Sequence, residues 1–199
     1  MKFQLFLKRI FDFFGALIGL ILLSPLFLIT ALLIKLDSPG PVFFQQERVG
    51  ENGKIFKIWK FRTMIKGSEK SNLSVSKIRK LEATGRDPRI TRIGRFFRRF
   101  AIDELPQLIN ILRGEMSFVG PRPYFLPRIQ INKALLTQRT RVKPGLTSLT
   151  IIRGGVRLSE EEILKFDFEY IKKQNLWFDL KILLKSIILV LSGKGFYGK

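Results

Sequence analysis

The sequence contains no cysteine and no histidine. The absence of cysteine excludes disulfide bonds and thiolate metal sites. The absence of histidine removes the commonest general base and the commonest metal ligand of proteins. Any chemistry must therefore use carboxylates, lysine, arginine, tyrosine or hydroxyl groups. A bound metal should be a hard cation held by oxygen, which favours magnesium over zinc.

Acidic residues are also scarce. The chain has 36 lysines and arginines against 16 aspartates and glutamates, a formal net charge of +20, although 46% of its 199 residues are hydrophobic. This combination indicates a surface that contacts anionic lipid headgroups or nucleic acid. A basic nucleic-acid-binding module would use the charge for phosphate contacts. It would not need the long uncharged stretch near the N-terminus, and no recognition motif is present, so we expect no nucleic-acid partner.

The segment from Phe13 to Ile34 contains no charged residue. At about 1.5 Å per helical residue it is long enough to cross a bilayer. Positive residues stand on both flanks, with Lys8 and Arg9 before the segment and Lys35 after it. The positive-inside rule then favours both ends of the segment in the cytoplasm.

A Ser24-Pro25 pair at the midpoint predicts a bend. Pro25 cannot donate a hydrogen bond to the carbonyl of Ile21, and the Ser24 hydroxyl can satisfy a freed backbone group in lipid. We therefore expect a re-entrant helix that breaks here and returns to the same side. The alternatives are a kinked crossing helix, an uncleaved signal sequence and a buried core helix. Asp12 is expected to pair with Lys8 or Arg9 near the interface.

The remainder of the sequence predicts a fold of the mixed α/β class. Strands are expected over Val42–Gln45 and Ile55–Phe61 around a turn at Gly50–Gly53, and a polar loop or short helix over Lys66–Lys80. Four further helices are expected, over Gly94–Phe100, over Asp103–Leu112 with Pro106 in its first turn, from Ser159 through Tyr170, and over Leu176–Leu191. The last is either an amphipathic helix in the membrane interface or a core helix. We expect the domain organisation to be a membrane hairpin, residues 1–36, and a second domain, residues 37–199, that carries any active site and acts with the hairpin as one unit.

Asp103-Glu104 is the acidic pair that best fits a catalytic role. One carboxylate can attack an electrophile while the other holds a divalent cation, and a helix N-terminus favours both carboxylates and phosphates. The alternative is a pair of acids that only stabilises the helix dipole. Arginines precede the pair at every third position from Arg86 to Arg98, and Arg99 follows. Their planar guanidinium groups suit diphosphates or anionic lipid.

Many strings of the chain, in collinear order, resemble one family, the bacterial sugar transferases, and among them its small monotopic phosphoglycosyl transferases. The strings are Lys8-Arg9, Ser24-Pro25, residues 35–42, 46–50, 56–64, 87–94 and 103–108, Gly120-Pro121-Arg122-Pro123, residues 142–147 and 179–183. They cover nearly the whole chain. The resemblance favours the catalytic interpretation of Asp103, and leaves a catalytically inactive membrane scaffold as the alternative.

The resemblance implies a small α/β domain on the cytoplasmic face of the bacterial inner membrane, anchored by the re-entrant helix. It implies a UDP-sugar and undecaprenyl phosphate, a polyprenyl phosphate, as substrates, and a requirement for magnesium. By resemblance, Asp103 attacks the β-phosphate, UMP leaves, and polyprenyl phosphate then displaces the phosphosugar from the aspartate. Glu104 would bind magnesium, which completes the catalytic pair. The implied substrate-binding residues are Lys60, Arg62, Arg98, Pro121, Arg122 and Pro123.

One segment departs from the family pattern. After Gly145-Leu146-Thr147, Ile151 stands where the family usually has glutamine, and Gly155 where it usually has arginine. Arg153 or Arg157 is the candidate for the missing charge, so we include both among the substrate-binding residues. Replacing either by alanine is expected to impair turnover more than replacing neighbouring surface arginines. The identity of the sugar and the oligomeric state stay open.

Overall fold

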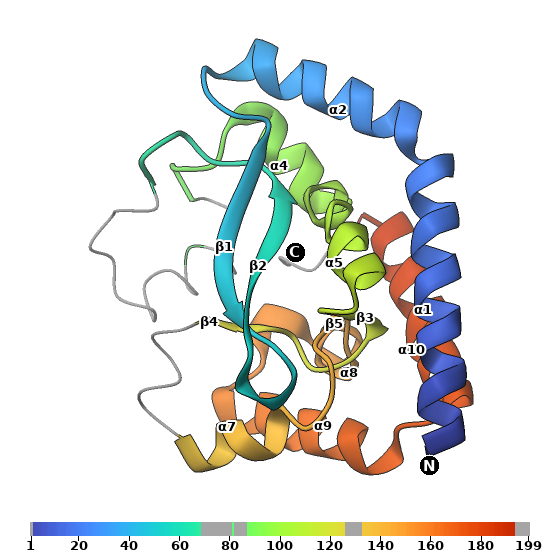
Figure 1. The fold of residues 1–199 in the computed structure, drawn as a ribbon. Coiled ribbons are helices and arrows are strands. Elements are labelled where there is room, and N and C mark those ends of the chain that lie inside the picture. The colour runs from blue at the N-terminus through green and yellow to red at the C-terminus, as the bar shows by residue number, and fades with distance from the viewer. Residues whose placement is uncertain (1, 69–80, 82–86, 126–132, 194–199) are drawn as a thin grey trace.

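The computed structural model describes residues 2–68, 81, 87–125 and 133–193. Two helices, α1 (Lys2–Leu22) and α2 (Ser24–Asp37), meet at a 60° bend. The bend lies at the expected Ser24-Pro25 pair, and the Ser24 hydroxyl donates to the Ile21 carbonyl over 2.8 Å, the carbonyl that Pro25 cannot serve. Figure 1 shows α1 along one side of the domain and α2 across one end of it.

The expected β-hairpin is present. Strands β1 (Phe43–Val49) and β2 (Ile55–Phe61) pair antiparallel around a 3₁₀ turn, η1 (Glu51–Gly53), and β4 (Tyr124–Phe125) pairs with the other edge of β1. β1 extends past the predicted Gln45. In a second sheet, β3 (Ser117–Val119) pairs in parallel with β5 (Gly145–Thr147).

Helices lie at both ends and along one side of the β1–β2 hairpin (Figure 1). They are α4 (Arg92–Arg99), the 3₁₀ turn η3 (Ile102–Glu104), α5 (Gln107–Arg113), α7 (Lys133–Arg139), α8 (Leu149–Arg153), η4 (Gly155–Arg157), α9 (Glu160–Lys173) and α10 (Leu176–Leu191). The expected helix start at Ser159 is confirmed as a capping box with Glu162. The helix expected over Asp103–Leu112 begins later, because Asp103 and Glu104 lie in η3 and Pro106 is the N-cap of α5. Most of the predicted Lys66–Lys80 loop lies outside the described residues.

The core joins α1 to the rest of the described chain. Ala16 is fully buried with Ile58 of β2 and with Leu108 and Ile111 of α5. Gly19 allows this close approach, since a Cβ there would lie 3.2 Å from the Leu108 side chain. One face of α1 is therefore packed on protein.

The polar residues of α1 also bind the domain. Lys8 forms an ion pair with Asp179 of α10 over 2.6 Å. Arg9 donates to the carbonyls of Ile111 and Leu112, at 2.7 and 2.8 Å, at the end of α5. The prediction that Asp12 pairs with Lys8 or Arg9 is wrong, because Asp12 accepts hydrogen bonds from β3 instead. Sequence proximity suggested the pair, whereas the packing of α1 on β3 supplied better partners.

No single described helix has both the length and the apolar composition needed to cross a bilayer, whereas α1 and α2 together, as a bent pair, reach them. Large apolar side chains are exposed on both helices, among them Phe14, Leu22, Leu28 and Leu36. α10 buries Ile182 in the core and exposes an apolar face. That face consists of Trp177, Leu180, Leu184, Ile187, Ile188 and Leu191.

Candidate active site

A chain reversal presents the acidic pair. α4 ends at Arg99, and Ala101 takes a left-handed conformation with φ of 52° before η3 begins. Non-glycine residues adopt this conformation at an energetic cost and are concentrated at functional sites. The reversal places Asp103 and Glu104 in the interior, with exposed fractions of 1% and 2%.

Two cations converge on Glu104. Lys60 Nζ, from β2, and Arg122 Nη2, from the segment between β3 and β4, each lie 2.8 Å from Glu104 Oε1. Buried carboxylates are tolerated when charged hydrogen-bond donors surround them. Three segments distant in sequence therefore meet at one carboxylate oxygen.

Asp103 stands in a different environment. Its buried Oδ1 has no hydrogen-bond partner among the described residues. Burial raises the pKa of the Asp103 carboxyl most strongly; the positive charge of Lys60 opposes this, the charge of Glu104 adds to it, and Arg98 and Arg122 lower it. The result is a carboxylate that is poorly solvated, and hence reactive, when it is ionised.

An open hollow of about 250 Å³ lies against Glu104. The residues that line it are Arg48, Ile58, Lys60, Glu104, Gln107, Arg122, Pro123, Gly145 and Leu146. Asp103 is adjacent in sequence to this lining and is not part of it. Arginine, lysine and glutamate around one hollow make a surface suited to phosphate groups and a cation.

Sequence reasoning did not assign Arg48 and Gln107 to the site. Arg48 donates to Gln46 Oε1 over 2.6 Å and reaches the Pro123 carbonyl at 3.5 Å. The hairpin register pairs Phe44 with Lys60, so Arg48, four residues further along β1, shares the face of Lys60. The alternation of the strand was the signal that could have found Arg48.

Two of the predicted arginines have different surroundings: Arg98 lies in α4, and Arg62 directly follows β2. Arg98 Nε donates to the Thr63 hydroxyl at 3.0 Å and lies near enough to Asp103 to lower its pKa. Arg62 instead donates to the carbonyls of Pro39 and Ser38, at 2.6 and 2.7 Å, just beyond the end of α2. The structure does not bring Arg62 to the hollow, and its charge stabilises the C-terminal end of α2.

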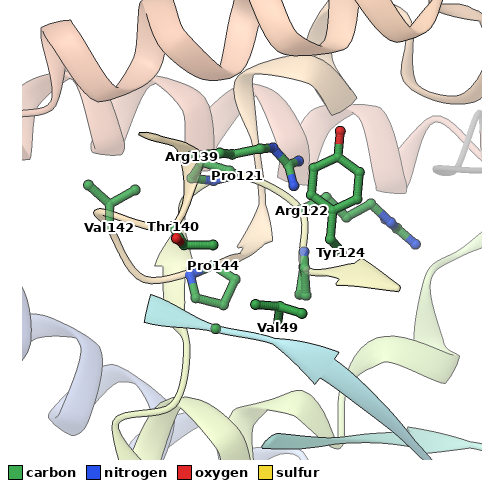
Figure 2. Close-up of a pocket in the computed structure, with 10 residues that line it drawn as sticks. Val49, Pro121, Arg122, Tyr124, Arg139, Thr140, Val142 and Pro144 are labelled. Carbon is green, nitrogen blue, oxygen red and sulfur yellow. The ribbon is translucent and has the colours of Figure 1, made fainter. Parts of the chain in front are cut away.

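The Pro121-Arg122-Pro123 segment separates the first hollow from a second one of about 230 Å³, which Figure 2 shows. The Arg139 guanidinium lies 3.8 Å from the centre of the Tyr124 ring and forms a 2.5 Å ion pair with Asp167. Burial raises the pKa of Asp167, while Arg139 lowers it. The Arg139 guanidinium and the Tyr124 ring thus line the second hollow beside the Pro-Arg-Pro segment.

Arg153 and Arg157 are exposed, and neither lines either hollow. The Arg153 guanidinium lies 5.8 Å from the centre of the Phe166 ring on α9. Ile151 is buried against Ala101, next to the chain reversal. The structure therefore does not bring the two arginines together with Glu104, although it brings Ile151 close to the acidic pair.

The donor set fits a hard cation that binds together with a substrate. Asp103 offers a buried oxygen without a hydrogen-bond partner among the described residues, and Glu104 follows it directly. Among those residues no group of three or more acidic side chains forms a cage. Magnesium is commonly held by one or two carboxylates plus phosphate oxygens, so such a cage is not required.

The sequence profile of the bacterial sugar transferases matches residues 3–193. The chain belongs to this family. A transferase named UDP-glucose:undecaprenyl-phosphate glucose-1-phosphate transferase, from Escherichia coli (strain K12), is 41% identical over 97% of the chain. The UDP-N-acetylgalactosamine-undecaprenyl-phosphate N-acetylgalactosaminephosphotransferase of Aeromonas hydrophila is 39% identical over 96% of the chain.

These two sugar transferases are longer than the chain, which spans 41% and 45% of their lengths. A second size class is represented by the exopolysaccharide production protein ExoY of Rhizobium meliloti, 39% identical, of which the chain spans 88%. The chain thus corresponds to a part of the longer transferases and to most of the shorter one.

Proposed function

We propose that the chain transfers a sugar-1-phosphate from a UDP-sugar to undecaprenyl phosphate or a similar polyprenyl phosphate, and so starts the assembly of a bacterial polysaccharide or glycoconjugate. The observation that carries the proposal is the buried Asp103-Glu104 pair, with Lys60 and Arg122 on Glu104. The names of the family members above support it, since two of them name a UDP-sugar and undecaprenyl phosphate.

In the first step an Asp103 carboxylate oxygen attacks the β-phosphorus of the UDP-sugar. A bond forms between this oxygen and phosphorus, and the bond from phosphorus to the oxygen that bridges the two phosphates breaks. UMP leaves with the electron pair, and the phosphosugar stays on Asp103. In the second step an oxygen of polyprenyl phosphate attacks the same phosphorus and displaces the carboxylate, which yields a polyprenyl diphosphate sugar.

Positive side chains lower the barrier by neutralising charge. Lys60 and Arg122 face the hollow beside Glu104, where they can bind the diphosphate and the leaving phosphate of UMP. Arg48 lines the same hollow and adds a third cation. Arg98, near Asp103, favours the ionised form that attacks.

Magnesium is the proposed cofactor, and Glu104 would hold it together with phosphate oxygens of the substrate. When bound, it supplies positive charge beside the diphosphate. The carboxylate chemistry of the pair and the lack of histidine and cysteine both suit this hard cation.

Membrane anchoring by α1 and α2 explains how one site serves a soluble donor and a lipid acceptor. The bend at Ser24-Pro25 and the exposed apolar surfaces of α1, α2 and α10 support a re-entrant, monotopic placement in the cytoplasmic leaflet of the inner membrane. Lys8 and Arg9 bind other groups of the protein. The contacts with anionic headgroups therefore come from the other basic residues of the chain.

The pKa of Asp103 should reflect both its burial and the positive charge of Lys60. By carboxyl-carbon NMR on magnesium-free protein, we expect Asp103 to titrate above the ordinary aspartate range, because burial disfavours its charged form. Lys60→Met should raise this pKa further, since Lys60 lowers it more than any other neighbouring charge does. Added magnesium should lower it, because a cation beside Glu104 favours the carboxylate.

The matched control is Lys57→Met, on the exposed face of the same strand. It should leave the titration unchanged. An Asp103 pKa in the ordinary range, or equal shifts in the two lysine variants, would contradict the electrostatics described above.

The proposed function is tested by UMP release from a panel of UDP-sugars. Detergent-solubilised protein is assayed with magnesium, with and without polyprenyl phosphate, and intact-protein mass spectrometry is run on the lipid-free sample. An accepted donor should add the mass of one phosphosugar. Absence of both the adduct and UMP release with every donor would favour an inactive scaffold, and release only with lipid would favour direct transfer.

A further inference from the structure

The carbonyl of Val119, the last residue of β3, accepts hydrogen bonds from two buried side chains. Lys8 Nζ lies 3.1 Å from this oxygen and the Tyr170 hydroxyl 2.9 Å from it. The same two groups contact Asp179, Lys8 at 2.6 Å and Tyr170 at 2.8 Å. The single hydroxyl proton of Tyr170 is therefore shared between the carbonyl and the carboxylate. Helices α1 and α9 thus meet on one backbone oxygen, and α10 joins them through Asp179, which contacts both donors.

Side chains of α1 also satisfy the edge of β3 that faces away from β5. Asp12 Oδ1 accepts from the Phe118 amide at 3.0 Å and from the Ser117 hydroxyl at 3.1 Å. Buried backbone groups need such partners, which a neighbouring strand normally supplies. Here Asp12 and Lys8 take the place of that strand.

The chain beyond Val119 is held on its other edge. Gly120 donates to the Thr147 carbonyl, and Gly145 donates to the Pro121 carbonyl, both over 3.0 Å. The next residue is Arg122, whose guanidinium reaches Glu104. Its backbone position is therefore set by contacts at Val119 on one edge and at β5 on the other.

We propose that Tyr170, with its partners Lys8 and Asp179, is a positioning residue that holds Val119 and so aims Arg122 at Glu104. The seating of α1 on the domain is thereby coupled to the active site. The expected effect on turnover rests on the proposed function, whereas the positioning of Arg122 does not. Burial and the neighbouring Asp179 hold the pKa of Tyr170 well above its ordinary value, so its hydroxyl keeps its proton.

Tyr170→Phe tests this role because it removes the hydroxyl and keeps the ring, which stacks on Phe178. We expect kcat to fall about tenfold, with a smaller change in KM for the UDP-sugar, if Arg122 acts mainly in the transition state. In an Arg122→Ala background, Tyr170→Phe should cause no further loss. A merely structural role would give the same loss in both backgrounds.

Ser159→Ala is the matched control. It removes the N-cap of α9, the helix that carries Tyr170, without touching Val119. It should lower the melting temperature while kcat stays close to that of the unchanged protein. A fall in kcat as large as that of Tyr170→Phe would show that general loosening of α9 explains the effect.

Arginine side-chain NMR tests the positioning without turnover. The Nε–H resonance of Arg122 is assigned by its loss in Arg122→Lys. Tyr170→Phe and Lys8→Gln should each shift it, and Ser159→Ala should not. If no UDP-sugar is turned over, the proposed function fails while this shift still decides the positioning. An unmoved resonance in Tyr170→Phe, or equal losses in both backgrounds, overturns the proposal.

Discussion

Asp103→Asn is expected to lower phosphosugar transfer by roughly 10⁴-fold and to abolish the covalent adduct, because the amide cannot attack phosphorus. The same substitution should leave the protein at least as stable at neutral pH. Burial raises the pKa of Asp103, so its charged form is disfavoured in the folded state relative to the unfolded chain. A neutral, nearly isosteric amide removes this unfavourable contribution.

The pH dependence of this stability difference follows from the linkage between proton binding and folding. An acid whose pKa is raised on folding stabilises the fold less as the pH rises from its ordinary pKa to its folded pKa. The variant lacks this loss, so its melting temperature should exceed that of the unchanged protein more at pH 7 than at pH 4. Melting curves at the two pH values, with intact-mass spectra of the lipid-free protein, provide the measurement. A phosphosugar adduct on Asp103→Asn would place the nucleophile elsewhere.

Gly145→Ala is expected to cause the largest loss of stability, more than about 3 kcal/mol of unfolding free energy. A Cβ at this position would overlap backbone atoms of Gly120 and the carbonyl of Thr147. Backbone atoms cannot move aside as a flexible side chain can, so the β3–β5 pair must separate. Arg122, two residues after Gly120, would then shift away from Glu104, and turnover should fall beyond what unfolding alone explains.

Denaturation in detergent and turnover below the melting temperature measure the two effects. Gly53→Ala is the control, because a Cβ there has no atom within 4 Å and meets only the strain of a φ of +78°. It should cost about 1 kcal/mol and leave turnover unchanged. Similar losses in the two variants would show that the close backbone packing at Gly145 does not determine the geometry of the site.

Local patterns predicted the elements that depend on neighbouring residues. The alternation and turn residues of the hairpin, the capping box at Ser159 and the break at Ser24-Pro25 all have short-range causes. The start of α5 was misplaced because the preference of acids for a helix N-terminus does not distinguish a helix from the preceding 3₁₀ turn. The left-handed Ala101 that creates this turn carries no sequence signal.

The roles of charged residues depended on tertiary structure. Lys60 and Arg62 stand two positions apart in one motif, yet Lys60 binds Glu104 and Arg62 binds the carbonyls after α2. Lys8 and Asp179 are distant in sequence, and their meeting depends on how α1 packs against the domain. Long side chains can reach several partners, and only the packing of distant elements selects among them.

The sequence by itself determined the family, the α/β class, the bent apolar helix pair and the acidic pair, because each of these depends on residue type, spacing and order along the chain. The tertiary structure alone decided that Lys60 and Arg122 share one oxygen of Glu104, that Asp103 is buried beside them, and that Arg48 joins the hollow. The physical reason is that burial and ion pairing act over distances of a few ångströms in space. These distances arise only when segments far apart in the chain pack together.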